Sequence, residues 1–184
     1  MAKKYKTPKI EELIEAGVHF GHQIKSWNPN MLPYIYTTRK NIHVIDLELT
    51  EELLEKAADF LYEIALKGGS IVFVGTKKQA RDIIEIEAKR SGAMYVTERW
   101  LGGTITNFEV IRKNNIKKLI DFRKGREEGE FEMYTKKERL LIDREIEKLD
   151  TYVGGLTRLT REPDALFVID SKREKTAVRE ANRA

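Results

Sequence analysis

The segment from Arg112 to Arg126 has the strongest charge asymmetry in the chain. Seven of its residues are basic and one, Asp121, is acidic. Each lysine or arginine that neutralises a phosphate releases counterions, so such a segment favours contact with a nucleic-acid backbone. The alternative is a solvent-exposed helix face whose charges pair three or four residues apart. The basic residues are Arg112, Lys113, Lys117, Lys118, Arg123, Lys124 and Arg126.

A second group of candidate contacts lies between Trp27 and Lys40. This segment places aromatic and amide side chains beside basic ones. Aromatic rings stack on unpaired bases, and arginine stacks or binds phosphate. Alternatively, Pro29 and Pro33 order a loop whose aromatic rings cover a sheet. The candidate RNA contacts here are Trp27, Asn28, Arg39 and Lys40.

Lys77 and Lys78 follow a turn at Gly75, where a helix is expected to begin. Unpaired backbone N–H groups at a helix N-terminus attract anions, so both lysines are candidate phosphate contacts. A single glycine makes neither a GxxxxGK phosphate loop nor a GxGxxG dinucleotide loop. An RNA phosphate or solvent is therefore favoured at this turn over a nucleotide, and we expect no cofactor.

The other residues with chemical potential are histidines and acids at strand ends. His19 and His22 have a His-x-x-His spacing, which makes them weak metal candidates, but such pairs are more often structural. Asp46 and Asp170 each end an expected strand, where doubly wound folds place ligands, or they cap the next turn. No Ser–His–Asp, Cys–His or paired-carboxylate arrangement stands out. We expect no metal site, no small-molecule substrate and no catalysis.

These residues are positioned by alternating strands and helices. Short apolar runs indicate strands buried in a sheet, and apolar residues three and four apart indicate helices. The alternation implies a doubly wound α/β fold with a parallel sheet and helices on both sides. The expected strands are 42–46, 71–74, 94–96 and 165–170, and the expected helices are 51–66, capped by Thr50, 77–90, and a last one capped near Ser171.

Residues 104–153 depart from this alternation and indicate two long helices separated by a break at Gly125–Gly129. Paired apolar stripes form an antiparallel, coiled-coil-like hairpin, which we expect to protrude from the sheet domain. We predict a sheet domain made of 1–103 and 154–184, with Trp100 anchoring the base of the inserted hairpin. The stripes are Phe108, Ile111, Leu119 and Phe122, interrupted by Asn115, and Ile142, Ile146, Leu149 and Val153.

The composition sets the class of protein. The chain has 184 residues, 35% of them charged, and a formal net charge of +4, so clustering of basic residues matters more than their excess. It has no cysteine, which excludes disulfides and thiolate metal sites. No signal peptide or membrane-length apolar run is present, which indicates a cytoplasmic protein with no membrane partner. Because no strand follows the last helix, we expect the chain to be truncated, with an open sheet edge.

Two long motifs stand out in the chain, FVGTKKQA at 73–80 and RWLGGTITNF at 99–108. Together with several shorter segments, they resemble the motifs of one family, ribosomal protein S-two of the bacterial small subunit, and they occur in the order of that family. We interpret the second motif as structural first and RNA-contacting second, and it adds Arg99 and Asn107 to the candidate RNA contacts. The other segments are EAGVHFGH at 15–22, WNP at 27–29, GGL at 154–156 and PDALFVID at 163–170.

The resemblance implies a flavodoxin-like parallel sheet with a protruding helical hairpin. It implies binding to small-subunit ribosomal RNA, contact with neighbouring small-subunit proteins, and help in docking ribosomal protein S-one. It brings no catalysis and no cofactor. Family members continue beyond the position of Ala184, which leaves completion of the sheet in doubt.

Two alternatives to a structural ribosomal protein remain from the residues. One is a nucleotide-binding α/β enzyme, based on the Gly75 turn and the strand-end acids, although a fold alone does not carry a function. The other is a free RNA-binding adaptor, which would stay off the ribosome.

Overall fold

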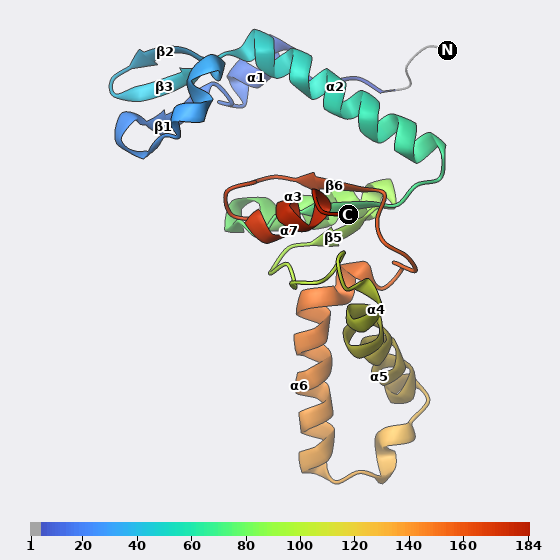
Figure 1. Cartoon of the computed structure of the whole chain (residues 1–184). Helices are drawn as coiled ribbons and strands as arrows, with labels where there is room; N and C mark the ends of the chain where they lie inside the picture. Colours follow the sequence, from blue (N-terminus) through green and yellow to red (C-terminus); the bar gives the residue numbers. More distant parts are fainter. Residues whose placement is uncertain (1–4) are drawn as a thin grey trace. The chain divides into compact units, whose positions relative to one another are not determined.

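A computed structural model describes residues 5–184 (Figure 1). The chain forms two compact units, Met1–Glu63 and Ile64–Ala184. The first unit contains a three-stranded antiparallel sheet in the order β1–β3–β2. Its elements are α1 (Ile10–Glu15), β1 (Phe20–Gln23), η1 (Ile24–Ser26), η2 (Pro29–Tyr34), β2 (Ile35–Arg39), β3 (Ile42–Ile45) and α2 (Leu47–Leu66), whose last turn belongs to the second unit.

The strand predicted at 42–46 for the parallel sheet is instead β3 of this antiparallel sheet, and that prediction was wrong. Lys40 and Asn41 have φ values of 50° and 62°. Such positive angles at two successive residues form the tight turn whose twist suits a hairpin. Arg39 therefore pairs directly with Ile42. The strand β2 was missed because the segment before this turn was interpreted as a loop.

The helix α2 begins at Leu47, four residues before its predicted start. Asp46 Oδ1 accepts hydrogen bonds from the backbone N–H of Glu48 at 3.0 Å and of Leu49 at 3.2 Å. These bonds satisfy donors that have no partner within the helix. Asp46 is thus the cap, as one of its two predicted roles required, and Thr50 is not.

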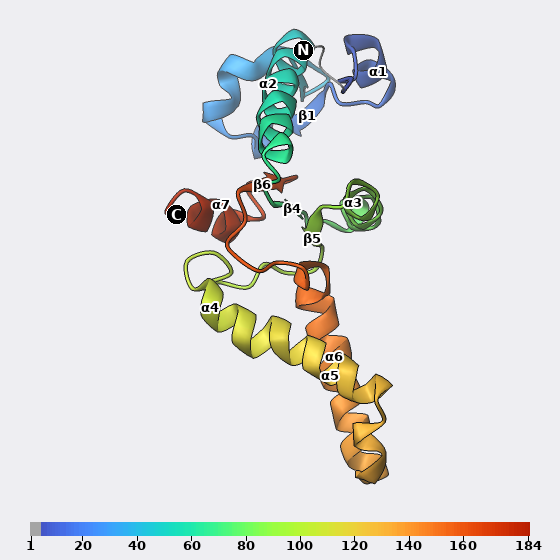
Figure 2. The same ribbon diagram turned by 90° about the vertical axis from the view of Figure 1, so that its right-hand side faces the viewer.

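The second unit is built on a parallel sheet in the order β5–β4–β6, which confirms the α/β class with parallel strands. Val72 and Val74 of the central strand are fully buried. The helices α3 and α7 lie on opposite sides of the sheet (Figure 2). The elements are β4 (Ile71–Val74), α3 (Lys78–Ser91), β5 (Met94–Val96), β6 (Ala165–Val168) and α7 (Lys175–Ala181).

The last helix begins at Lys175, after a turn and not at Ser171. Asp170 Oδ1 caps that turn, accepting hydrogen bonds from the backbone N–H of Lys172 and Arg173, both at 3.1 Å. Asp170 therefore has the capping role that was one of its two predicted roles.

Between β5 and β6 the chain is helical. The first helical run turns back through a short loop, so that α5 and α6 lie against each other in opposite directions (Figure 1). The elements are α4 (Phe108–Ile111), the π-helix η3 (Arg112–Lys117), α5 (Lys118–Glu127), η4 (Glu130–Met133), α6 (Lys136–Val153) and η5 (Gly154–Leu156).

Gly125 lies inside α5, so the helix continues past the predicted start of the break. A Cβ atom at this position would lie 3.0 Å from the ring of Phe131, which returns against the helix from η4. Glycine is needed here for that close approach, whereas Gly129, with φ of 75°, makes the turn itself.

One apolar core joins the parallel sheet to the helical segment. Buried residues of β4 and β5 belong to the same cluster as Phe108 and Leu119 of the first helical run and Ile146 of α6. The base of the helical segment is therefore fixed to the sheet by packing, which sets the positions of the candidate contacts described next. In the part of the chain that is described, every helix is too short or too polar to cross a membrane.

Candidate nucleic-acid interface

The basic segment Arg112–Arg126 contains both paired and unpaired cations. Five of its seven basic side chains form ion pairs with the chain's own carboxylates. Two of these pairs are local and long, Arg112–Glu109 at 3.9 Å and Lys124–Glu128 at 3.6 Å, with exposed side chains. Such exposed pairs contribute little and leave both cations available to another anion.

The other three pairs join α5 to α6. Lys118 Nζ lies 2.9 Å from Glu145 Oε1, and this hydrogen bond is the main cause that lowers the pKa of Glu145. The structure thus gives Lys118 and Arg123, both predicted RNA contacts, a part in holding the two helices together. The three pairs are Lys118–Glu145, Arg123–Asp150 and Arg126–Asp143.

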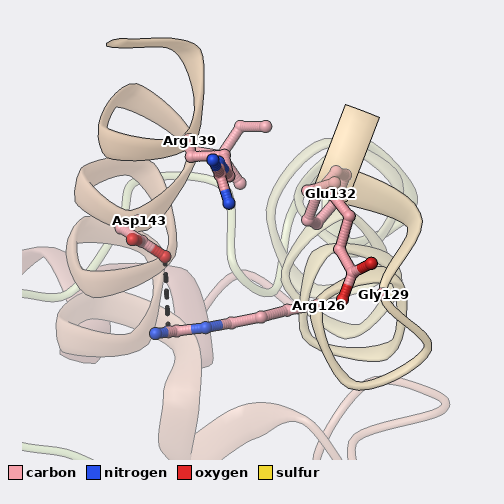
Figure 3. A pocket seen from close by; sticks show the side chains of 7 residues that line it. Arg126, Gly129, Glu132, Arg139 and Asp143 are labelled. Atoms are coloured by element: carbon pink, nitrogen blue, oxygen red, sulfur yellow. Dashed lines mark ion pairs between the residues drawn. The ribbon is translucent and has the colours of Figure 1, made fainter. Parts of the chain in front are cut away.

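A hollow of about 190 Å³ lies at the far end of the two helices (Figure 3). The guanidinium of Arg126 reaches across it to Asp143 at 3.4 Å, and Arg139 stands on the same helix as Asp143. Two arginines and two acids, Asp143 and Glu132, line the hollow together with Gly129, Phe131 and Ile142. Its charges balance, so it does not favour a phosphate.

The cross-helix pairs change which cations remain free. Lys113 and Lys117 on η3 have no carboxylate partner within residues 5–184, and both are exposed. Asp143 and Asp150 of α6 pair with cations of α5, and Glu145 is shared between Lys118 of α5 and Lys148 of its own helix. The α6 cations left without an ion pair in the described chain are Lys136, Lys137, Arg139 and Arg144. Sequence reasoning missed these four, because α6 is balanced in composition.

The loop between β5 and α4 carries Arg99 and Asn107. Both side chains are exposed, and Asn107 makes no side-chain cap to α4. Between them, Trp100 is 6% exposed within the core, which confirms its predicted burial. The buried carboxylate of Glu180 fixes the loop, accepting hydrogen bonds from the N–H of Gly103 at 2.7 Å and of Ile105 at 3.0 Å. Two exposed polar side chains are thus presented by a rigid loop.

The turn before α3 already holds an anion of the chain itself. Glu174 is 5% exposed, and its Oε1 accepts hydrogen bonds from the N–H of Thr76 at 3.1 Å and the hydroxyl of Thr76 at 2.5 Å. Arg173 Nε donates to the same hydroxyl at 2.9 Å. The backbone group that would receive a nucleotide phosphate is therefore occupied by a carboxylate. Lys77 and Lys78 remain exposed beside it.

The four candidate RNA contacts of the first unit fall into two groups, one with structural contacts and one exposed. The ring of Trp27 lies 4.9 Å from that of His43, and the side chain of Asn28 accepts a hydrogen bond from Asn30 N–H at 3.0 Å, capping η2. These two residues have local structural roles, in line with the alternative interpretation of the segment. Arg39 and Lys40 are exposed at the β2–β3 turn.

The histidines do not assemble a metal site in the described chain. His19 is half-buried with its ring 4.1 Å from that of Phe20, and His22 is exposed. The buried His43 has Nδ1 3.0 Å from the hydroxyl of Thr38. Across residues 5–184, no three His, Asp or Glu side chains gather closely enough to hold a metal ion.

The family model of ribosomal protein S2 matches residues 13–184 of the chain. The match includes both helices of the charged segment, the rigid loop and the turn before α3.

Proposed function

The chain belongs to the ribosomal protein S2 family, whose members are structural constituents of the small ribosomal subunit and not enzymes, and we propose that it binds small-subunit ribosomal RNA and supports translation as part of that ribonucleoprotein. Its location is then the ribosome in the cytoplasm, beside neighbouring small-subunit proteins. The occupied turn at Thr76 argues against the nucleotide-binding alternative.

The observation that carries RNA binding is the distribution of free charge on the helical segment. After the cross-helix pairs are formed, six cations on η3 and α6 lack a carboxylate partner in the described chain. RNA phosphates can neutralise these six cations, and the release of counterions that accompanies this favours binding. We propose that residues 104–153 act as an arm that carries this charge away from the sheet.

The same proposal includes the exposed candidates of the loops. Arg39, Lys40, Lys77, Lys78 and Arg99 are all exposed and lack a carboxylate partner among the residues described. Asn107 adds an exposed amide. Crosslinking of assembled subunits followed by peptide mapping is expected to recover peptides that contain these residues. Recovery of none of them would restrict RNA contact to the arm.

Salt-dependent binding tests the function. Affinity of the purified chain for a small-subunit ribosomal RNA transcript is expected to fall steeply between 50 and 200 mM salt, about 10³-fold or more if six phosphates are contacted. A tagged chain is expected to sediment with small subunits. Affinity that is indifferent to salt, or a chain that stays in the unbound fraction of a cell extract, would contradict the proposal and favour the adaptor or enzyme alternatives.

We also propose that the first unit helps to dock ribosomal protein S-one. An apolar hollow of about 500 Å³ lies in this unit, lined in part by Ile10, Ile14, Tyr36 and Ile45. Tyr36 is 76% exposed and Ile14 50%, so both offer apolar surface to a partner without holding the unit together.

Removal of that surface tests S-one docking. The double variant Ile14→Ala, Tyr36→Ala is expected to bind purified S-one at least about 10-fold more weakly, because two large apolar contacts are lost. Phe60→Ala, which removes an exposed ring outside the hollow, is the matched control. Equal affinity of the double variant and the parent chain would exclude this surface.

A further inference from the structure

The π-helix η3 accommodates one residue more than a regular helix allows. Phe108 and Ile116 are both buried, at 4% and 2% exposure, and belong to the same core. At 3.6 residues per turn, the residue that lies most nearly in line with Phe108 after two turns is the seventh, Asn115, whereas Ile116 is the eighth. Bonds from i to i+5 absorb the additional residue. Ile116 thereby takes the core position that a regular helix would give to Asn115.

This irregularity is not required by the core. Deletion of Asn115 would place the isoleucine now at 116 seven residues after Phe108 and leave the spacing of Ile116 to Leu119 unchanged. A regular helix would then present the same apolar side chains to the same core. Asparagine is also a poor helix former, so two of them in succession oppose a regular helix. π-turns inside α-helices occur frequently at functional sites.

The turn carries the two unpaired cations of the first helical run. Lys113 and Lys117 are four residues apart, both exposed, and both without a carboxylate partner in the described part of the chain. Asn114 places an exposed amide between them. Ile116 and Leu119, at 2% and 0% exposure, anchor the backbone directly beneath. The lysines therefore stand on a stretch of backbone that is fixed by the core.

We propose that the π-turn Arg112–Lys117 is a phosphate-binding site for the backbone of folded RNA, with Lys113 and Lys117 as the phosphate contacts and Asn114 as an additional donor. The additional residue sets the relative direction of the two lysines. In a regular helix they would be offset differently around the axis, while the charge would be the same. Three later cations of the same helical run, Lys118, Arg123 and Arg126, hold α5 to α6 instead. This inference rests on the proposed RNA-binding function.

Three variants of the full chain separate geometry from charge. The first is the double variant Lys113→Ala, Lys117→Ala, which removes both phosphate contacts. The second is a deletion of Asn115, which removes the π-turn without changing the charge. The third is the charge-matched control Lys172→Ala, Lys175→Ala, on another exposed segment. Each is measured for affinity to a small-subunit ribosomal RNA transcript across a salt series. Urea unfolding is followed for each as well.

Loss of two phosphate contacts is expected to lower affinity by about 25- to 60-fold at 0.1 M salt, and to reduce the slope of log affinity against log salt by about 1.5. The Asn115 deletion is expected to unfold at the same or higher urea concentration than the parent, yet bind about 10-fold more weakly. The control is expected to bind within about 2-fold of the parent.

Parent-like affinity of the Asn115 deletion would overturn the site, because charge alone would then suffice. A deletion that unfolds at much lower urea would also overturn it, because packing would then explain the π-turn. So would an equal loss in the control, or variants that bind RNA normally but fail to join subunits, which would indicate an acidic protein partner. If the parent chain itself does not bind ribosomal RNA, the proposed function fails and not merely this site.

Discussion

Replacement of Glu180 by alanine is expected to loosen the loop between β5 and α4. The carboxylate is 8% exposed and lies 75 positions from one of its partners in the sequence. Its two oxygens accept hydrogen bonds from Gly103 N–H at 2.7 Å and Ile105 N–H at 3.0 Å. Alanine removes both acceptors and leaves two backbone donors with no partner in the protein.

The magnitude follows from those two donors. Each buried N–H left unsatisfied costs about 1–3 kcal/mol. The expected loss is about 2–6 kcal/mol in the free energy of unfolding, with the lower part of the range reached if water enters the loop. With a urea m value of about 2 kcal/mol/M, the midpoint falls by about 1–3 M. Glu180→Gln retains one acceptor oxygen, so it is expected to lose roughly half as much.

Urea unfolding measures this loss, and hydrogen exchange locates it. The amide protons of Gly103 and Ile105 are expected to exchange slowly in the parent chain and quickly in Glu180→Ala, because their acceptor is gone. Glu162→Ala removes an exposed glutamate and serves as the control, with an expected change within about 0.5 kcal/mol. If Glu180→Ala unfolds at the same urea concentration as this control, the loop does not depend on the carboxylate and the reasoning fails.

Three further substitutions test packing and charge. Gly155→Ala would make a Cβ overlap the carbonyl oxygen of Tyr95 and lie 2.8 Å from its ring, so urea unfolding should show a loss of about 3 kcal/mol or more; a neutral result would mean the loop shifts freely. Leu119→Ala, at 0% exposure, should cost about 2–5 kcal/mol by the same assay, and less than about 1 kcal/mol would contradict its core position. The Ser70 backbone N–H is the main cause that lowers the pKa of Asp164 in the folded chain. Stability from this carboxylate is therefore full above its unfolded pKa of about 4 and lost as pH falls through the lower folded value, so Asp164→Asn should flatten the decline of stability below about pH 4, and an unchanged acid profile would refute it.

The sequence by itself determined features that depend on local pattern. Short apolar runs located the three parallel strands, because a strand buried in such a sheet needs apolar residues on both faces. The capping roles of Asp46 and Asp170 could be predicted from their positions at strand ends, because these side chains accept hydrogen bonds from N–H groups only two or three residues away. The long motifs also identified the family.

The sequence misassigned what depends on pairing between strands. The run at 42–46 looks like the other buried strands, and only the turn at Lys40 and Asn41 sends it into an antiparallel sheet. A strand pattern records which faces are apolar but not which neighbour supplies the hydrogen bonds. The nearby turn residues were the available signal.

The tertiary structure decided which charges are free. Lys118 finds Glu145 across 27 positions, and Thr76 finds Glu174 across 98. The spacing of residues along one helix or strand cannot predict partners so far apart in the sequence. Packing of the apolar faces brings the two elements together, and each charged side chain then pairs with the residue that faces it. The π-turn also shows itself only in the folded chain: Ile116 is buried in the shared core, while Lys113 and Lys117 are exposed and unpaired on the described surface.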